Sequence, residues 1–139
     1  MDRLLLLPVF AHVLLVGLIA IALGRARVQA AKSGAVKLAN IAIDSSGWPD
    51  NVRKIANAYA NQFEQPLLFL AAVAFILIFG LADMVSLALA SLYMAARYAH
   101  AYVHTGSNAV MPRFRLFLLS NAFLVLLWLW FGLRLVISP

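Results

Sequence analysis

Two groups of polar residues stand at the ends of long apolar segments, where their side chains could do chemistry. Asn61 and Glu64, the only glutamate of the chain, directly precede the apolar residues 66–80, and Arg97 and His100 lie near the end of a second apolar segment. Ionisable side chains at membrane depth are costly, so they normally face a bundle interior or a water-filled cavity. We therefore expect the two groups to share a polar pocket near one membrane face.

The first group offers a carboxylate and an amide on one helix face, because Asn61 and Glu64 are three residues apart. A carboxylate accepts hydrogen bonds from a ligand ammonium or from an arginine, and an asparagine both donates and accepts. An ion pair between Glu64 and Arg97 that only joins two helices explains the same residues. The sequence leaves both interpretations open.

The second group is a stripe with spacings of four, three and four residues, formed by Tyr93, Arg97, His100 and His104, with Tyr98 and Tyr102 beside it. Arginine and tyrosine donors suit an anionic ligand such as a carboxylate or a thiolate. Snorkelling side chains and an aromatic belt place the same residue types at this depth. The belt also explains Trp128 and Trp130, which we interpret as anchors at the opposite interface.

The composition is that of an integral membrane protein with one domain. The chain has 139 residues, of which 65% are hydrophobic, and its mean hydropathy is +0.93, whereas soluble domains are nearer half apolar. The absence of cysteine excludes disulfides, thiolate metal sites and a cysteine nucleophile. The net charge of +6 comes from basic residues that fall mainly in expected loops, and no nucleic-acid motif accompanies it, so we expect no nucleic-acid partner.

The hydropathy pattern predicts an all-α protein, a four-helix bundle over residues 1–139, with spans at about 4–23, 52–81, 84–104 and 114–137. We expect the second helix to begin near Asp50 and to kink just after Glu64, because Pro66 removes a backbone hydrogen bond. The first span also has features of a cleaved signal peptide, but its length favours retention.

The basic residues predict the orientation. Most of them lie on the side that holds the first and third connections, which the positive-inside rule places in the cytoplasm. Both termini would then lie on the non-cytoplasmic side of the membrane, which we expect to be a bacterial inner membrane. The polar pocket would lie at the cytoplasmic end.

The polar segments resemble those of the MAPEG family, the membrane-associated proteins of eicosanoid and glutathione metabolism. The segment 60–70, ANQFEQPLLFL, looks like the helix-two signature of the family, and the segment 96–102, ARYAHAY, looks like its helix-three signature. The pattern Arg-x-x-His is similar to that of the microsomal glutathione transferases. The pattern Arg-Tyr-x-x-x-Tyr is similar to that of the leukotriene C synthase branch.

The resemblance implies a homotrimer of four-helix bundles that binds glutathione between neighbouring subunits, near the cytoplasmic face. It implies a glutathione-dependent transferase or peroxidase acting on hydrophobic electrophiles dissolved in the lipid. The positions that match the glutathione-binding residues of the family are Asn61, Glu64, Arg97, Tyr98, His100 and Tyr102. Arg113 falls at the spacing of the arginine linked to thiolate activation, since a cation near sulfur lowers the thiol pKa.

The sequence also departs from the family pattern. Asn57 stands where the family commonly has an arginine that helps to hold a glutathione carboxylate, and Ala95 stands where a second arginine is found. Lys54, one turn earlier, is a candidate substitute. These departures favour an alternative, a non-catalytic accessory or scaffold subunit of a larger membrane complex.

Overall fold

The computed structural model describes residues 1–41 and 44–137, and every regular element in these residues is helical. The helices are α1 (Asp2–Lys32), α2 (Asp50–Ala60), α3 (Pro66–Ile78), α4 (Met84–Thr105) and α5 (Val110–Ile137), with short 3-10 turns at Leu38–Ile41 and Ser45–Gly47. The predicted all-α class is confirmed. α1 and α5 are long and apolar enough to cross a membrane, and α3 is a shorter apolar helix.

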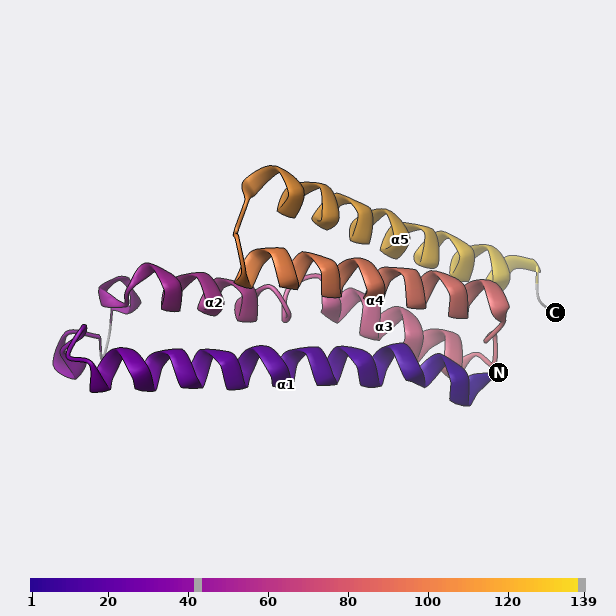
Figure 1. Cartoon of the computed structure of the whole chain (residues 1–139). Coiled ribbons are helices and arrows are strands. Elements are labelled where there is room, and N and C mark those ends of the chain that lie inside the picture. Colours follow the sequence, from indigo (N-terminus) through magenta and orange to yellow (C-terminus); the bar gives the residue numbers. More distant parts are fainter. Residues whose placement is uncertain (42–43, 138–139) are drawn as a thin grey trace.

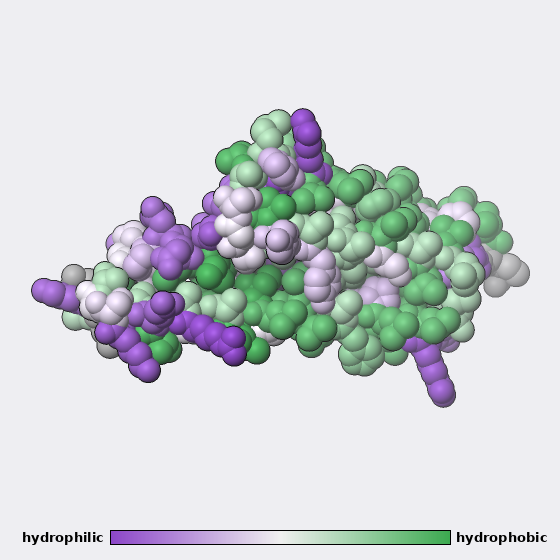
Figure 2. Space-filling view, in the orientation of Figure 1, coloured by the Kyte–Doolittle hydropathy of each residue, from purple (hydrophilic) through white to green (hydrophobic). Residues whose placement is uncertain are grey.

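The helices run side by side along one long axis (Figure 1). α2 and α3 follow one another along the flank of α1, α4 packs beside them, and α5 packs on α4 while diverging from it toward its own N-terminal end. The first residues of α1 and the last turn of α5 lie at the same end of the molecule. Hydrophobic residues cover most of the face in Figure 2, and hydrophilic ones gather where α1 and α2 extend past the other helices.

α1 is longer than the predicted span because Gly24 does not end the helix. The residues that follow are mostly strong helix formers such as Ala, Arg and Gln. Leu23 and Ala30 pack against Val52 of α2. The helix ends where Gly34 adopts a φ of +72° and the Ala35 amide donates to the Ala30 carbonyl. At 31 residues α1 is about 46 Å long, so roughly 16 Å extend beyond a hydrocarbon core.

The helix expected to kink at Pro66 is broken into two. α2 ends at Ala60 and α3 begins at Pro66, with a turn over residues 61–65 between them. A proline at this position has no N–H to donate, and its ring would clash with the Gln62 carbonyl of a continuous helix. The Gln62 side chain instead donates to the Ala58 carbonyl at the end of α2, at 2.9 Å. The turn brings Glu64 to the surface.

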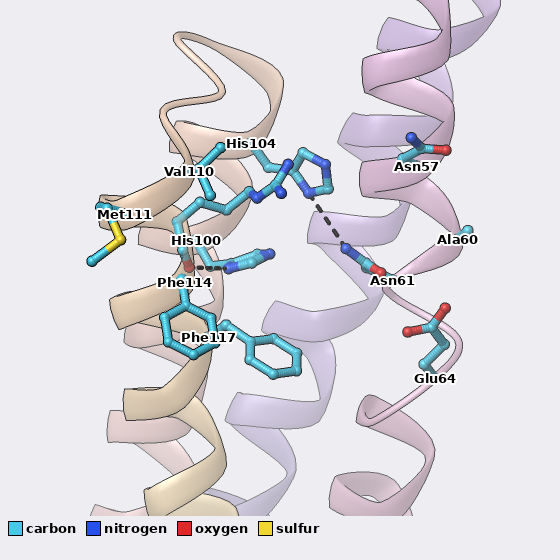
Figure 3. Close-up of a pocket in the computed structure, with 11 residues that line it drawn as sticks. Asn57, Ala60, Asn61, Glu64, His100, His104, Val110, Met111, Phe114 and Phe117 are labelled. Carbon is cyan, nitrogen blue, oxygen red and sulfur yellow. Dashed lines mark hydrogen bonds between the residues drawn. The ribbon is translucent and has the colours of Figure 1, made fainter.

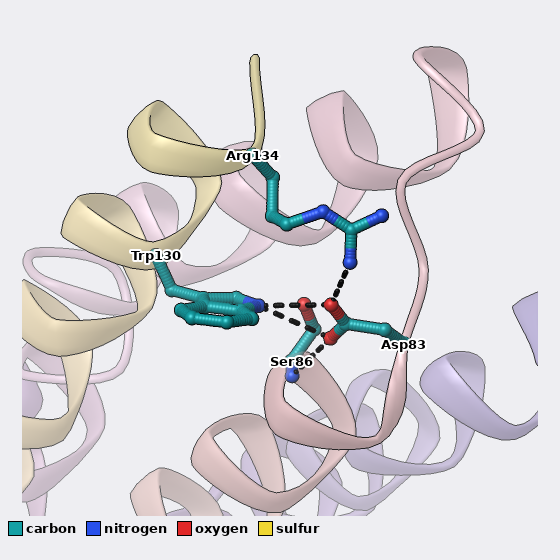
Figure 4. Close-up of polar contacts among 4 residues, drawn as sticks. All are labelled: Asp83, Ser86, Trp130 and Arg134. Carbon is teal, nitrogen blue, oxygen red and sulfur yellow. Dashed lines mark hydrogen bonds and ion pairs between the residues drawn. The ribbon is translucent and has the colours of Figure 1, made fainter. Parts of the chain in front are cut away.

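A polar cluster joins the loop before α4 to the C-terminal part of α5 (Figure 4). Asp83 caps α4 by accepting from the Ser86 amide at 2.8 Å, and it also accepts from the Trp130 indole and pairs with Arg134 of α5. Burial raises the pKa of the Asp83 carboxyl, but the hydrogen bonds from Ser86 and Trp130 and the charge of Arg134 outweigh it, so the pKa is lowered. Trp130, expected to be an interface anchor, therefore also joins α5 to the loop before α4.

Candidate functional site

A pocket of about 590 Å³ lies between the α2–α3 side and the α4–α5 side of the molecule (Figure 3). One side presents Asn57, Ala60, Asn61 and Glu64, and the other presents His100, His104, Val110, Met111, Arg113, Phe114 and Phe117. The turn at residues 61–65 and the loop between α4 and α5 position these side chains. We call this cavity the candidate pocket.

Hydrogen bonds fix both imidazoles of the pocket. The Asn61 carboxamide nitrogen approaches His104 Nδ1 at 3.4 Å, and His100 Nδ1 donates to the Arg113 carbonyl at 3.1 Å. Because a carbonyl only accepts, the proton of a neutral His100 resides on Nδ1. Nε2 of His100 is buried and has no hydrogen-bond partner among the described residues. One wall of the pocket is therefore formed by an imidazole with one ring nitrogen that no described residue pairs with.

Arg113 is held at the pocket by the loop that precedes α5. Its Nη1 donates to the Asn108 carboxamide oxygen at 2.5 Å. Asn108 has a φ of +52°, a left-handed conformation that asparagine tolerates better than most residues. Its backbone N–H donates to the Val103 carbonyl. Arg113 is half-buried and lies in the first turn of α5, where the positive end of the helix dipole adds to its charge. This wall of the pocket suits an anion.

Arg97 lies outside the candidate pocket and binds the turn at residues 61–65, which forms one of the pocket walls. Its side chain is 1% exposed, and its Nη2 donates to the Asn61 carbonyl at 2.9 Å and to the Gln62 carboxamide oxygen at 3.3 Å. Asn61 caps the C-terminus of α2, where a cation is favoured by the helix dipole. The alternative of a Glu64–Arg97 ion pair is not what the geometry shows, because among the described residues Glu64 makes no ion pair.

The two tyrosines lie on a different side of α4, toward α1. The Tyr98 hydroxyl donates to the Ala11 carbonyl at 2.7 Å, and the Tyr102 side chain is 80% exposed. Both line a shallow groove with residues of α1. Within one chain, then, the structure brings together Asn61, Glu64, His100 and Arg113, places Arg97 behind them, and separates Tyr98 and Tyr102 from them.

The structure adds residues that the sequence prediction of the site did not include. Phe114 and Phe117 line the pocket, and Gln62 is buried beneath it. His104 also lines the pocket; it belongs to the predicted polar stripe but not to the positions that match the family. The spacing of Phe114 and Phe117 just after Arg113 was the available signal, since these residues share a face of α5. Lys54 donates to the Gly106 carbonyl at 2.7 Å and does not line the pocket, whereas Asn57 does.

The arrangement combines a carboxylate, amides, imidazoles and one guanidinium with an apolar wall of phenylalanines. Glu64 and Arg113 provide opposite charges within one cavity, so the pocket suits a ligand that carries both charges. The apolar wall suits a hydrophobic group bound next to it.

The family model described as MAPEG family matches residues 5–133 of the chain. Searches of curated proteins and of solved structures found no match.

Proposed function

We propose that this chain, which belongs to the MAPEG family, is a membrane-bound glutathione-dependent transferase or peroxidase that acts on hydrophobic electrophiles. The observation that carries the proposal is the candidate pocket, where Glu64 and Arg113 offer opposite charges beside an apolar wall. Glutathione has an ammonium group that can bind Glu64, a thiol that can ionise beside Arg113, and peptide groups that can bind the polar side chains of the pocket.

In this proposal each pocket residue has a chemical role. Glu64 accepts from the ammonium of glutathione, and Asn61 and His100 bind its polar groups. Arg113 favours the thiolate over the thiol, because a neighbouring cation lowers the thiol pKa. The thiolate then attacks an electrophile that lies against Phe114 and Phe117.

The proposal includes a homotrimer of four-helix bundles, with residues 1–139 as one domain. α1, α4 and α5 each span the membrane, and α2 with α3 forms the remaining span. Glutathione binds between subunits, so the exposed Tyr102 of one subunit completes the pocket of its neighbour. Arg97 and Tyr98, which bind backbone carbonyls of their own chain, hold the helices that shape the site.

The test is calorimetric titration of glutathione into the detergent-solubilised protein. We expect binding in the wild type, and binding about tenfold weaker in Glu64→Gln, because a charge-assisted contact with the ammonium is lost. Asp50→Asn is the matched control, since Asp50 is exposed and pairs only with Arg53 among the described residues. Absence of wild-type binding at millimolar glutathione would contradict the proposal.

One observation favours a second candidate function, a non-catalytic accessory or scaffold subunit of a larger membrane complex. Asn57 lines the pocket at the position where the family resemblance expects an arginine, so Arg113 is the only guanidinium among the residues that line it. This alternative predicts stable co-purification with a larger assembly in mild detergent. A free, homogeneous trimer in native mass spectrometry would count against it.

A further inference from the structure

A second cavity, of about 550 Å³, lies between α3 and α5. Gln65, which lines it, follows Glu64 directly, and Asn121, which also lines it, lies one helical turn beyond Phe117. We call this cavity the α3–α5 groove. The two cavities are therefore neighbours along α5, and residues of the turn at 61–65 line both of them.

The walls of the α3–α5 groove are apolar and fixed in place. Leu68 and Val125 are 55% and 56% exposed at its rim, while Leu124 is buried beneath it. The indole nitrogen of Trp128 donates to the Leu68 carbonyl at 3.2 Å, which ties α5 to α3 on the side away from the candidate pocket. A long apolar group can therefore lie in a groove whose shape is set before it binds.

Two amide side chains interrupt this apolar lining without an internal partner. The carboxamide oxygen of Gln65 is buried and has no hydrogen-bond partner among the described residues. The side chain of Asn121 makes no hydrogen bond with any described residue, although it lies eleven residues into α5, about 17 Å from the start of this apolar helix. Unpaired amides are costly at such depth, so a polar ligand group bound between them would lower the free energy.

We propose that the α3–α5 groove holds the body of the hydrophobic substrate and that Gln65 and Asn121 select a hydroxyl group on it. A hydroxyl can donate to the Gln65 oxygen and accept from an Asn121 N–H. Asn121 is eight residues beyond Arg113, about 12 Å along the helix. Resting on the proposed function, this predicts a long-chain electrophile whose hydroxyl lies about 12 Å from the carbon that the thiolate attacks.

The kinetic test compares three electrophiles in glutathione conjugation. Two are synthetic long-chain 2-alkenals, one with and one without a hydroxyl at the far end of the chain, and the third is the small 1-chloro-2,4-dinitrobenzene. We expect Asn121→Leu to raise the KM of the hydroxylated alkenal about tenfold and to leave that of the other two unchanged, because only that contact is lost. The matched control is Ala122→Leu, which adds a similar apolar side chain on an exposed side of α5.

The outcomes separate the two proposals. If the wild type conjugates the small electrophile but Asn121→Leu affects both alkenals equally or neither, the selection of a hydroxyl is wrong and the transferase proposal stands. If the wild type conjugates none of them, the transferase proposal fails. Direct labelling then tests whether the α3–α5 groove binds hydroxylated chains. Loss of the oligomer in Asn121→Leu, seen by native mass spectrometry, would mean that another subunit fills the groove and would overturn the inference.

The labelling uses a long-chain alcohol that carries a diazirine, cross-linked by light to the solubilised protein and mapped by peptide mass spectrometry. Cross-links on residues 121–129 that weaken in Asn121→Leu but not in Ala122→Leu support the groove as a site for hydroxylated chains, with or without turnover. Cross-links elsewhere, or equal labelling in the two variants, overturn it.

Discussion

At the scale of single residues, Arg97 illustrates how a charge inside an apolar bundle can serve structure. It is 1% exposed, and it donates to the carbonyl that ends α2 and to the Gln62 side chain. Removing such a donor would leave buried acceptors unsatisfied, which costs more than the hydrogen bonds themselves contribute. Arg97 thus stabilises the turn that places Asn61 and Glu64 at the candidate pocket.

We predict that Arg97→Lys destabilises the protein although it keeps the charge. The single ammonium group cannot reproduce the planar guanidinium that reaches two acceptors, so we expect a loss of about 1–3 kcal/mol in the free energy of unfolding. Denaturant unfolding in micelles measures this loss. Arg115→Lys, at an exposed position of α5, is the control and should be neutral. An Arg97→Lys protein as stable as this control would refute the capping role.

A second residue-scale prediction concerns the orientation of Arg113. Asn108→Gly keeps the left-handed backbone accessible but removes the side chain that accepts from the Arg113 guanidinium. If Arg113 stabilises bound thiolate, its release should raise the apparent pKa of the bound thiol by roughly one unit, or about 1.4 kcal/mol. A pH titration of thiolate absorbance measures it. Arg113→Ala sets the upper limit of the effect, and an Asn108→Gly titration identical to wild type would contradict the prediction.

At the scale of elements, both ends of α4 depend on contacts from other helices. Its N-terminus is capped by Asp83, which also binds Trp130 and Arg134 of α5 (Figure 4). Near its C-terminus, Lys54 of α2 donates to the carbonyl of Gly106. These contacts position the helix that contributes His100 and His104 to the candidate pocket.

The Asp83 cluster predicts a pH-dependent stability. Its folded-state pKa lies below the ordinary value of 3.8, so ionised Asp83 stabilises the fold above about pH 4 and this contribution is lost as the pH falls through the lowered pKa. Asp83→Asn keeps a capping acceptor but removes the charge. We expect it to cost about 0.5–1 kcal/mol at pH 7 and progressively less below pH 4.

Thermal unfolding in detergent between pH 3 and pH 7 measures this dependence. Asp50→Asn removes an exposed carboxylate whose ion-pair partner among the described residues is Arg53 alone, at 3.3 Å, so it should change stability little across the range. A constant difference between wild type and Asp83→Asn at all pH values would show that the charge of Asp83 does not stabilise the fold.

The sequence predicted the positions of helices better than their ends. The break near Pro66 was expected as a kink, because proline forbids a continuous hydrogen-bond ladder. The break is complete because the side chains of Gln62 and Arg97 donate to carbonyls at the end of α2 and so stabilise the turn at residues 61–65. The extension of α1 to Lys32 was missed because it is supported by packing against α2, a contact between residues distant in sequence.

At the scale of the whole molecule, the surface divides into a long apolar region and a polar end where α1 and α2 extend (Figure 2). Exposed Leu14, Leu18 and Ile21 of α1 belong to the apolar region. In a membrane protein such a surface meets lipid or other subunits. Arg25, Arg27 and Lys32, in the last part of α1, lie toward the polar end, which the positive-inside rule predicts to be cytoplasmic.

The absence of cysteine makes this orientation directly testable. We predict that an impermeant maleimide labels Asp2→Cys in intact spheroplasts, but labels Ser107→Cys, in the loop between α4 and α5, only after the cells are lysed. The N-terminus lies near the start of α4 and Ser107 follows the other end of α4, so each variant controls for the other. The reverse pattern would invert the topology and place the candidate pocket on the other side of the membrane.

The sequence by itself determined the membrane character, the helical class, the family and the polar residues around Glu64 and Arg97, because composition, periodicity and local motifs encode them. Tertiary structure alone decided which of these residues meet. Asn61, Glu64, His100 and Arg113 come from three separate segments, and their shared pocket depends on a helix break and a loop conformation. Arg97 and Tyr98 have the residue types of ligand donors, yet within one chain Arg97 Nη2 donates to the Asn61 carbonyl and the Gln62 side chain, and the Tyr98 hydroxyl donates to the Ala11 carbonyl. These contacts join residues distant in sequence, so only the packing of the helices decides them.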